Sequence, residues 1–333
     1  MKYKNFLYIT LIFKILLFSC EKEIEFKGNE MKTMLVLNGL LMPDSIVTIN
    51  LTESRFFLDD GLSFKKINNA TVELWKDGIK IENLLNTEGG NYIGTYIPKV
   101  GDKLLITASC DGFESIECYT EIVIPTPILC VDTLTIDEMR YYYYQNENGV
   151  ISVTDSSSYF LIINSELKIT FNDPKDIPNY YMLKIYWRYF FSDGDSLDLI
   201  VRYKTEDLIF QSRNKISPFE NEEYLRSTLF NDELFDGKEY TLKINADQYV
   251  GIFVGKDPFN PDGHFFDIIK KELFVDLQSL SYPYYMYLKT RESQSNLDGV
   301  MEYFGEPAQI YSNVKGGTGI LGNYSSYRLC ILF

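Results

Sequence analysis

The alternation of apolar and polar positions predicts strands along most of the chain. Between residues 34 and 125, short alternating runs recur with turn residues every ~8–12 positions, which is typical of a β-sandwich. Val72 and Leu74 would share one face of such a strand, and Asp77-Gly78 would close a two-residue hairpin after it. A similar turn is expected at Asp111-Gly112. Residues 34–125 are therefore expected to form one sandwich.

The rest of the chain, residues 126–333, is expected to form a larger β-rich domain with one or two short helices. The boundary is Pro125-Thr126-Pro127, where two prolines fix the backbone and predict a short, semi-rigid joint. The predicted strands of this domain cover residues 131–136, 141–144, 150–154, 167–171, 180–191, 197–203, 207–211, 238–246, 265–280 and 327–333.

One segment, Ser281 to Arg291, follows the period of a helix instead. Its serine can cap the first turn, and Pro283 fits within that turn. Tyr284, Tyr287 and Leu288 recur at helical spacing, so we expect them to bury one face against the sheet.

A cluster of glycines before the last strand predicts a flexible loop. Gly316, Gly317 and Gly319, together with Asn313, could present backbone N–H groups to an anion or form a contact with a partner. The same glycines could instead serve tight turns. The segment lacks the GK[ST] ending of a P-loop.

Four consecutive tyrosines, Tyr141, Tyr142, Tyr143 and Tyr144, are a second candidate binding surface. Their rings could stack on sugars or rest on a partner protein. Side chains alternate along a strand, so at most two of the four rings can share a face. An exposed hairpin with one buried face explains them equally well.

The N-terminus has the features of a lipoprotein signal peptide. Lys2 and Lys4 precede a mostly apolar run over residues 6–18, and Ser19 comes directly before Cys20. The run is too short for a stable transmembrane helix. We therefore expect residues 1–19 to be removed and Cys20 to carry a diacylglyceryl anchor, since two chains are what stable anchoring needs.

Residues 20–33 would then form an acidic tether behind the anchor. The acidic residues from Glu21 to Glu25 resemble the surface-export signal of Bacteroidota lipoproteins. This resemblance implies display on the outer face of the outer membrane. A generic charged tether is the alternative interpretation.

Composition indicates a folded chain that repels anions. Apolar residues make up 45% and aromatic residues 15% of the 333 positions, which excludes a disordered protein. The formal net charge is −15, so nucleic acid is not an expected partner.

Four cysteines remain besides the lipidation site, and they allow three pairings. Cys110 and Cys118 lie on consecutive predicted strands, whereas Cys130 and Cys330 lie near the two ends of the second domain. Export would permit disulfides between them, but buried free thiols are equally plausible.

No catalytic, cofactor or metal motif stands out. His264 is the only histidine, no CxxC or GxSxG is present, and the segment from Asp257 to His264 lacks the spacing of an EF-hand. Turn chemistry explains that segment better. A pair of carboxylates at the spacing that glycoside hydrolysis needs cannot be recognised from sequence, so a glycosidase remains an alternative.

Two resemblances extend this interpretation. The order of Ala70-Thr-Val-Glu-Leu, Gly90-Asn-Tyr, Gly101-Asp-Lys and Gly112-Phe is similar to an Ig-like or prealbumin-like module of carboxypeptidase-regulatory type. A longer series of motifs resembles an uncharacterised Bacteroidota lipoprotein family, a domain of unknown function: Cys20-Glu-Lys-Glu-Ile, Val36-Leu-Asn-Gly-Leu-Leu, Ala70-Thr-Val-Glu-Leu-Trp, Phe171-Asn-Asp-Pro, Leu229-Phe-Asn-Asp-Glu-Leu-Phe-Asp-Gly-Lys, Tyr284-Tyr-Met-Tyr-Leu-Lys and Glu306-Pro-Ala-Gln-Ile-Tyr-Ser-Asn-Val-Lys-Gly-Gly-Thr-Gly-Ile-Leu-Gly.

The second resemblance implies an outer-membrane lipoprotein, often encoded beside a TonB-dependent receptor, with no established active site. We therefore expect a non-catalytic accessory that helps such a receptor to capture or take up an unknown small ligand. The alternatives are a surface hydrolase acting on glycans or peptides, and a structural or adhesive envelope protein.

Overall fold

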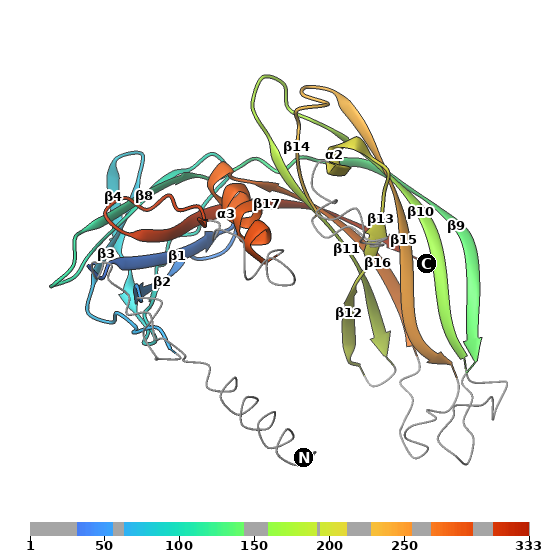
Figure 1. Cartoon of the computed structure of the whole chain (residues 1–333), viewed down its shortest axis with the longest axis horizontal. Helices are drawn as coiled ribbons and strands as arrows, with labels where there is room; N and C mark the ends of the chain where they lie inside the picture. The colour runs from blue at the N-terminus through green and yellow to red at the C-terminus, as the bar shows by residue number, and fades with distance from the viewer. Residues whose placement is uncertain are drawn as a thin grey trace, which may run out of the picture.

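The protein is mainly β, as its sequence pattern predicts (Figure 1). The computed structural model describes residues 32–55, 63–142, 159–191, 194–211, 228–254, 268–295 and 309–332. Within these ranges the chain forms two layered β units with separate apolar cores. No helix in the described ranges has the length and apolar character needed to cross a bilayer.

The first unit packs two sheet layers around one core. One layer contains β1 (Leu35–Leu41), β2 (Thr48–Glu53), β5 (Leu85–Asn86) and β6 (Asn91–Ile93). The other layer has the order β4-β3-β7-β8, with bounds β3 (Thr71–Lys76), β4 (Ile79–Asn83), β7 (Lys103–Ser109) and β8 (Ile116–Glu121). Val72 and Leu74 share the buried face of β3, and Asp77-Gly78 turns tightly into β4 with positive φ angles, as predicted.

The second unit is also two-layered, and its core is rich in aromatic rings. One layer has the order β13-β15-β10-β9, with bounds β9 (Ile128–Tyr142), β10 (Tyr159–Asn172), β13 (Arg202–Lys204) and β15 (Glu239–Val254). The opposite layer contains β11 (Tyr180–Phe191), β12 (Ser196–Ile200), β14 (Leu229–Asn231) and β16 (Ile268–Leu280). Phe171, Tyr181, Phe230 and Phe235 meet between the layers with centroid separations of 5.2–6.3 Å.

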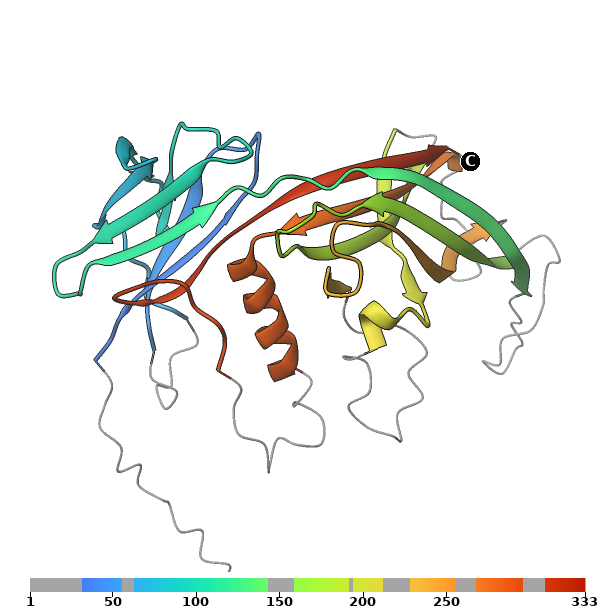
Figure 2. The ribbon, with the colours of Figure 1, turned by 90° about the horizontal axis from the view of Figure 1, so that it is seen from above.

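One strand, β17 (Thr318–Leu332), belongs to both units (Figure 2). Val36 of β1 pairs in parallel with Thr318, and this pairing continues to Leu41 with Asn323. From Tyr324 onward, β17 instead pairs antiparallel with β16. The two units therefore share a nine-stranded sheet, in the order β12-β11-β16-β17-β1-β2-β6-β5 with β14 paired to β11.

The inward-facing side chains of β17 follow the passage from one core to the other. Leu321 packs in the first core, whereas Tyr327, Leu329 and Ile331 pack against the second. Between these groups, the inward positions are the fully buried polar residues Asn323 and Ser325. A polar side chain is stable there only if it is hydrogen-bonded, and these two bind the segment that links the units.

The helix predicted from Ser281 is present as α3 (Tyr282–Ser295). The Ser281 carbonyl accepts from the Tyr285 N–H at 2.9 Å, and its hydroxyl accepts weakly from the Tyr284 N–H at 3.4 Å. The expected buried face is partly wrong, because Tyr285 and Leu288 are buried and Tyr284 and Tyr287 are only half-buried. The reason is that α3 packs on a small cluster of its own, which includes Leu229 and Leu280.

Four strand predictions need correction. The separate strands predicted at 131–136 and 141–144 form the single strand β9, in which Tyr141 and Tyr142 pair with Phe160 and Tyr159 of β10 rather than with residues 150–154. Residues 207–211 form the short helix α2 (Leu208–Gln211), because the Asp207 carboxylate accepts from the Ile209 N–H at 3.2 Å and favours a turn there. The single strand predicted over 197–203 is two strands, since β12 and β13 lie in opposite layers. The last strand begins at Thr318 rather than at 327, so Gly319 lies within it.

Candidate functional site

A hollow lined by described residues lies at the junction of the two units. It has a volume of about 440 Å³ and is mostly apolar. Its walls come from three segments far apart in sequence: the end of β8 and the linker after it, the loop before β11, and the corner between β16 and α3. The lining residues are Gly101, residues 119–124, Pro174, residues 177–180 and residues 279–283. We call this hollow the junction cleft.

Large apolar side chains are unusually exposed around the junction cleft. Ile124 is 66% exposed, Ile177 is 59% exposed, and the rings of Tyr119 and Tyr282 are about half exposed, at 51% and 48%. Exposed apolar residues are common singly, but a group of them that converges on one hollow is typical of a contact surface. Tyrosine suits such a site, since its ring buries area while its hydroxyl can still find a hydrogen-bond partner.

The walls of the junction cleft are fixed by buried polar contacts. The Asn323 amide donates to the Thr120 hydroxyl at 2.6 Å and to the Glu121 carbonyl at 2.8 Å, while its oxygen accepts from the Val123 N–H at 3.0 Å. The Ser325 hydroxyl donates to the Val123 carbonyl at 2.6 Å. These bonds hold the linker against β17, so the cleft is formed before any ligand arrives.

The proline-rich joint is fastened to the second unit as well. The Thr126 N–H donates to the Ser279 hydroxyl at 3.1 Å, and the Thr126 hydroxyl lies 3.2 Å from that of Tyr181. Tyr181 in turn donates to the Asp173 carboxylate at 2.5 Å. Burial and this bond raise the pKa of Tyr181, so the phenol stays protonated as the donor.

Behind the loop that lines the cleft, three carboxylates converge. The oxygens of Asp173, Asp232 and Asp236 lie within 4.8 Å of one another, and they are the residues of the described ranges that could together hold a metal ion. Burial raises the pKa of Asp173, and its two acidic neighbours add to the rise. Bonds within the loops already satisfy these groups: Gly237 N–H donates to Asp173, and Asn179 N–H donates to Asp232.

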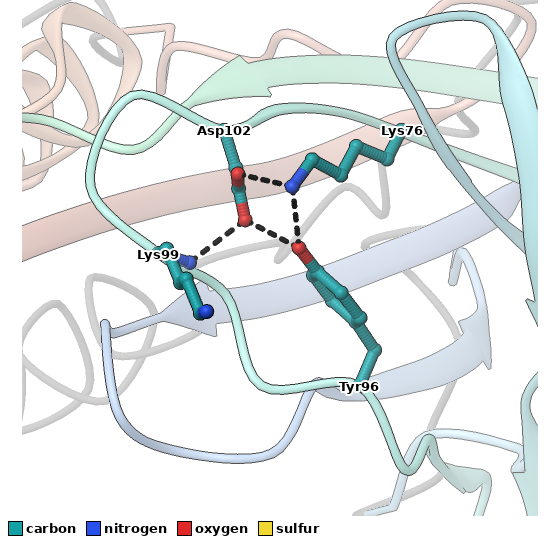
Figure 3. Close-up of polar contacts among 4 residues, drawn as sticks. All are labelled: Lys76, Tyr96, Lys99 and Asp102. Carbon is teal, nitrogen blue, oxygen red and sulfur yellow. Dashed lines mark hydrogen bonds and ion pairs between the residues drawn. The ribbon is translucent and has the colours of Figure 1, made fainter.

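A Lys–Tyr–Asp network in the first unit is a further candidate on chemical grounds (Figure 3). The Lys76 ammonium lies 2.6 Å from the Asp102 carboxylate and donates to the Tyr96 hydroxyl at 2.8 Å. The Tyr96 hydroxyl donates to the Asp102 carboxylate at 2.6 Å, and the Lys99 N–H donates to the same carboxylate at 2.8 Å. The network thus joins β3 to the loop between β6 and β7.

The pKa values in this network move away from neutrality. Burial opposes ionisation of Asp102, but its bonds with Lys76, Tyr96 and the Lys99 N–H outweigh it and lower the pKa of the carboxyl group. The bond to Asp102 raises the pKa of Lys76, and burial together with the same carboxylate raises that of Tyr96. Efficient general acid–base catalysis needs a pKa near the working pH, so this arrangement is suited to bracing the fold.

The predicted glycine loop has a structural task. A Cβ at Gly316 would lie 2.4 Å from the Ser115 carbonyl oxygen, one at Gly317 2.4 Å from that of Leu35, and one at Gly319 2.0 Å from that of Leu37. Asn313 bonds to both the N–H and the carbonyl of Leu321, at 2.9 Å each. These contacts correspond to the alternative in which the glycines serve tight turns and close packing.

The cysteines predicted as disulfide partners are free. In the register of β7 and β8, Cys118 lies opposite Ile106 and not near Cys110. Cys130 lies on β9 and Cys330 on β17, in opposite layers of the second unit. Burial raises the pKa of the Cys118 thiol to about 12.

Two predicted features fall largely outside the described residues. Cys20 and most of the 20–33 tether precede residue 32, and Tyr143 and Tyr144 lie beyond the end of β9. The backbone of Tyr141 and Tyr142 is described, and these residues pair with Phe160 and Tyr159 of β10. The hairpin partner predicted at 150–154 also lies outside the described ranges.

Together, fold and cleft define a mainly β protein with two layered units on a shared sheet and an open apolar hollow between them. The family model described as "Domain of unknown function (DUF4249)" matches residues 21–329, and the chain belongs to this family. The matched range includes both units, which confirms the expected membership of a family of unknown function. A search of the curated proteins found no match.

Sequence reasoning missed the junction cleft. Its lining residues are spread between positions 101 and 283, and the motifs that contain some of them, such as Gly101-Asp-Lys and Phe171-Asn-Asp-Pro, do not indicate that they lie side by side. The only signal available was the run of apolar and aromatic residues on either side of predicted turns, such as Ile124 before Pro125 and Tyr282 before Pro283.

Proposed function

We propose that this protein is a surface-exposed outer-membrane lipoprotein that acts, without catalysis, as an accessory to a TonB-dependent receptor in ligand capture or uptake. The observation that carries the proposal is the junction cleft, a preformed apolar hollow with exposed Tyr119, Ile124, Ile177 and Tyr282 at its border. Binding sites between structural units typically combine a preformed apolar lining with a few polar groups.

The residues of the cleft support binding rather than bond cleavage. Glu121 is the only carboxylate among its described lining residues, whereas glycoside hydrolysis uses a pair of carboxyl groups about 5–10 Å apart. Asp173, Asp232 and Asp236 do form a cluster nearby, but they do not line the cleft and already accept hydrogen bonds from their own loops. An exposed Tyr- and Ile-rich surface matches the composition of protein contact sites.

The proposed lipid anchor at Cys20 would allow even a weak contact with the receptor to be occupied. A lipid-anchored protein stays in the plane of the membrane, so its effective concentration near a receptor in the same membrane is high. The receptor contact can then be modest in area and still be occupied most of the time.

The experiment is affinity purification of the mature lipoprotein from its own outer membrane, followed by identification of the proteins recovered. We expect a TonB-dependent receptor to be recovered with the native protein. An Ile124→Ser, Ile177→Ser double variant should lose most of it, because two exposed apolar contacts become polar. Ile79→Ser is the matched control, since Ile79 is 69% exposed on β4, away from the cleft.

Three results would contradict the proposal. Recovery without any such receptor favours the structural or adhesive alternative. Turnover of a glycan or peptide by the purified protein favours the hydrolase. Equal receptor recovery with the double variant and with Ile79→Ser would show that the junction cleft does not contact the receptor.

The anchor needs its own test. A Cys20→Ala variant should leave the membrane fraction and be recovered as a free protein, because the acceptor thiol for the lipid is gone. Unchanged membrane association of this variant would refute lipidation at Cys20.

A further inference from the structure

A second hollow, separate from the junction cleft, lies between helix α3 and the outer face of the first unit. Its volume is about 380 Å³. Strands β1, β2 and β6 form its floor, and Tyr284 and Tyr287 of α3 line its side. The remaining lining residues are Asn38, Gly39, Leu40, Thr48, Ile49, Asn50, Asn91 and Ile320. We call this hollow the asparagine groove.

Three asparagines cross the floor of the groove in one row. Asn38 of β1 pairs in register with Asn50 of β2, and Asn50 pairs with Asn91 of β6. Asparagine is depleted in strands, so three in direct cross-strand register call for an explanation beyond sheet stability. Residues in register share a face, and neighbouring strands lie about 4.8 Å apart, so the three amides form a ladder across the sheet.

Part of this ladder is preorganised, and part of it is free. The Asn50 amide donates to the Asn91 oxygen at 2.8 Å and to the Gly89 carbonyl at 3.1 Å, which fixes both side chains. Asn38 and Thr48 are exposed, and no side-chain hydrogen bond to either is found in the described part of the chain. The groove therefore offers both a fixed amide pair and an amide and a hydroxyl that can bond to a ligand.

Helix α3 holds its tyrosines close to this floor. A Cβ at Gly322 of β17 would lie only 2.8 Å from the Cβ of Tyr284, so the glycine lets the helix approach the sheet. Tyr284 also stacks on Tyr324 with ring centroids 6.3 Å apart and an interplanar angle of 23°. The aromatic wall is thus fixed relative to the amides.

The lining excludes two classes of ligand. Its described lining residues include no Lys, Arg, Asp or Glu, so its floor offers no charge to attract an ion, a phosphate or a peptide terminus. The described cation beside the aromatic wall is Arg291, whose guanidinium lies 5.7 Å from the centroid of the Tyr287 ring. The backbone of β1 and β2 is paired on both sides within the sheet, so an added peptide strand finds no free edge here. Recognition must come from neutral amides, hydroxyls and aromatic surface.

We propose that the asparagine groove binds a neutral saccharide. A sugar ring presents apolar C–H groups that pack on an aromatic ring, and its hydroxyls both donate and accept, which matches an amide side chain. The volume lies within the range of small-ligand sites. This inference does not depend on the junction cleft or on a receptor partner.

The test is saturation-transfer NMR on the purified mature lipoprotein with a panel of neutral di- and trisaccharides built from glucose, galactose, mannose, xylose and N-acetylglucosamine. The protein is kept in a detergent without a sugar headgroup, because a glycoside detergent would compete for the groove. We expect at least one neutral saccharide to bind at millimolar or lower concentration, and the anionic sugar sialyllactose not to bind at this site.

Two variants locate the binding. Asn38→Ala, at an exposed position whose side chain makes no hydrogen bond in the described ranges, should weaken affinity by about tenfold. Tyr287→Ala should weaken it more, because the aromatic surface is lost. Phe64→Ala is the matched control and should leave affinity unchanged, because this aromatic residue is 55% exposed and lines neither hollow. The proposal is overturned if no neutral saccharide on the panel binds, or if binding is unaltered in Asn38→Ala with unchanged thermal unfolding.

Discussion

The side-chain amide of Asn323 donates to the hydroxyl of Thr120 over 2.6 Å, although 203 positions of sequence separate them. Asn323 lies at the point where β17 leaves the first core, and Thr120 lies near the end of β8, where the chain leaves the first unit. The two residues therefore bind together the two stretches of chain that connect the units.

Replacing Asn323 by Ala should destabilise the protein by about 2–4 kcal/mol. Three hydrogen bonds are lost, and the Val123 N–H and Thr120 hydroxyl keep their burial without this partner. Urea denaturation at neutral pH measures the change. Asn38→Ala is the control, with an expected effect within about 0.5 kcal/mol because the side chain is exposed. Equal effects of the two substitutions would contradict a bracing role for Asn323.

Gly319→Ala should prevent stable folding or cost more than about 4 kcal/mol. Its φ of +115° disfavours any side chain, and the new Cβ would overlap the Leu37 carbonyl in the parallel β1–β17 pairing. Gly112→Ala has a similar φ of +88° but open space around it, so it should cost only about 1–2 kcal/mol. The yield and denaturation midpoint of each variant distinguish steric overlap from backbone strain. A loss of stability in Gly319→Ala no larger than that in Gly112→Ala would refute the close approach of Gly319 to the Leu37 carbonyl.

Stability should fall in acid partly through Asp102. Its folded-state pKa is lowered, so its contribution is present above the unfolded-state value of about 4 and is lost as pH falls through the folded-state value. Asp102→Asn should therefore be less stable than the native protein at pH 7, and the difference should shrink towards pH 3. Urea midpoints at the two pH values measure it. A difference that grows in acid would mean that the carboxylate is not the stabilising form.

Alkylation should discriminate the four cysteines of the folded protein. Cys130 and Cys330 are exposed and free, so iodoacetamide should modify them at alkaline pH without prior reduction. Cys118 is buried and its pKa is raised to about 12, so it should react only after unfolding. Mass spectrometry of tryptic peptides, with and without prior reduction, measures this. Labelling of Cys130 and Cys330 that requires reduction would restore the disulfide prediction.

Local signals predicted much of the fold. The turn at Asp77-Gly78 and the buried pair Val72 and Leu74 follow from residues close in sequence, as does the helix that begins after Ser281. The parallel pairing of β1 with β17 leaves no such signal, because parallel neighbours need no short turn between them. The helix at residues 208–211 was missed for a different reason, since its signal is local but the apolar run was given more weight than the capping residue Asp207.

The candidate sites were harder to predict than the strands. The asparagine groove depends on cross-strand register. Asn38 and Asn50 lie on consecutive strands, whereas β3, β4 and β5 come between Asn50 and Asn91 in the sequence. The glycines near residue 317 were correctly noted as special, but whether they face a ligand or a neighbouring backbone depends on the strand that lies beside them. The sequence shows that asparagines and glycines stand at unusual positions, but the neighbouring strand that explains each of them is known only from the tertiary structure.

Because both units share β17, the first unit cannot complete its sheet until the C-terminal end of the chain has been synthesised. Ribosomes make the N-terminal end first, yet β1 must wait for a parallel neighbour encoded at the far end of the message. Until that neighbour emerges, one side of β1 is an open edge of apolar sequence, the kind of edge that favours aggregation. Premature termination anywhere before Thr318 would therefore spoil the portion already synthesised as well as the portion that is missing.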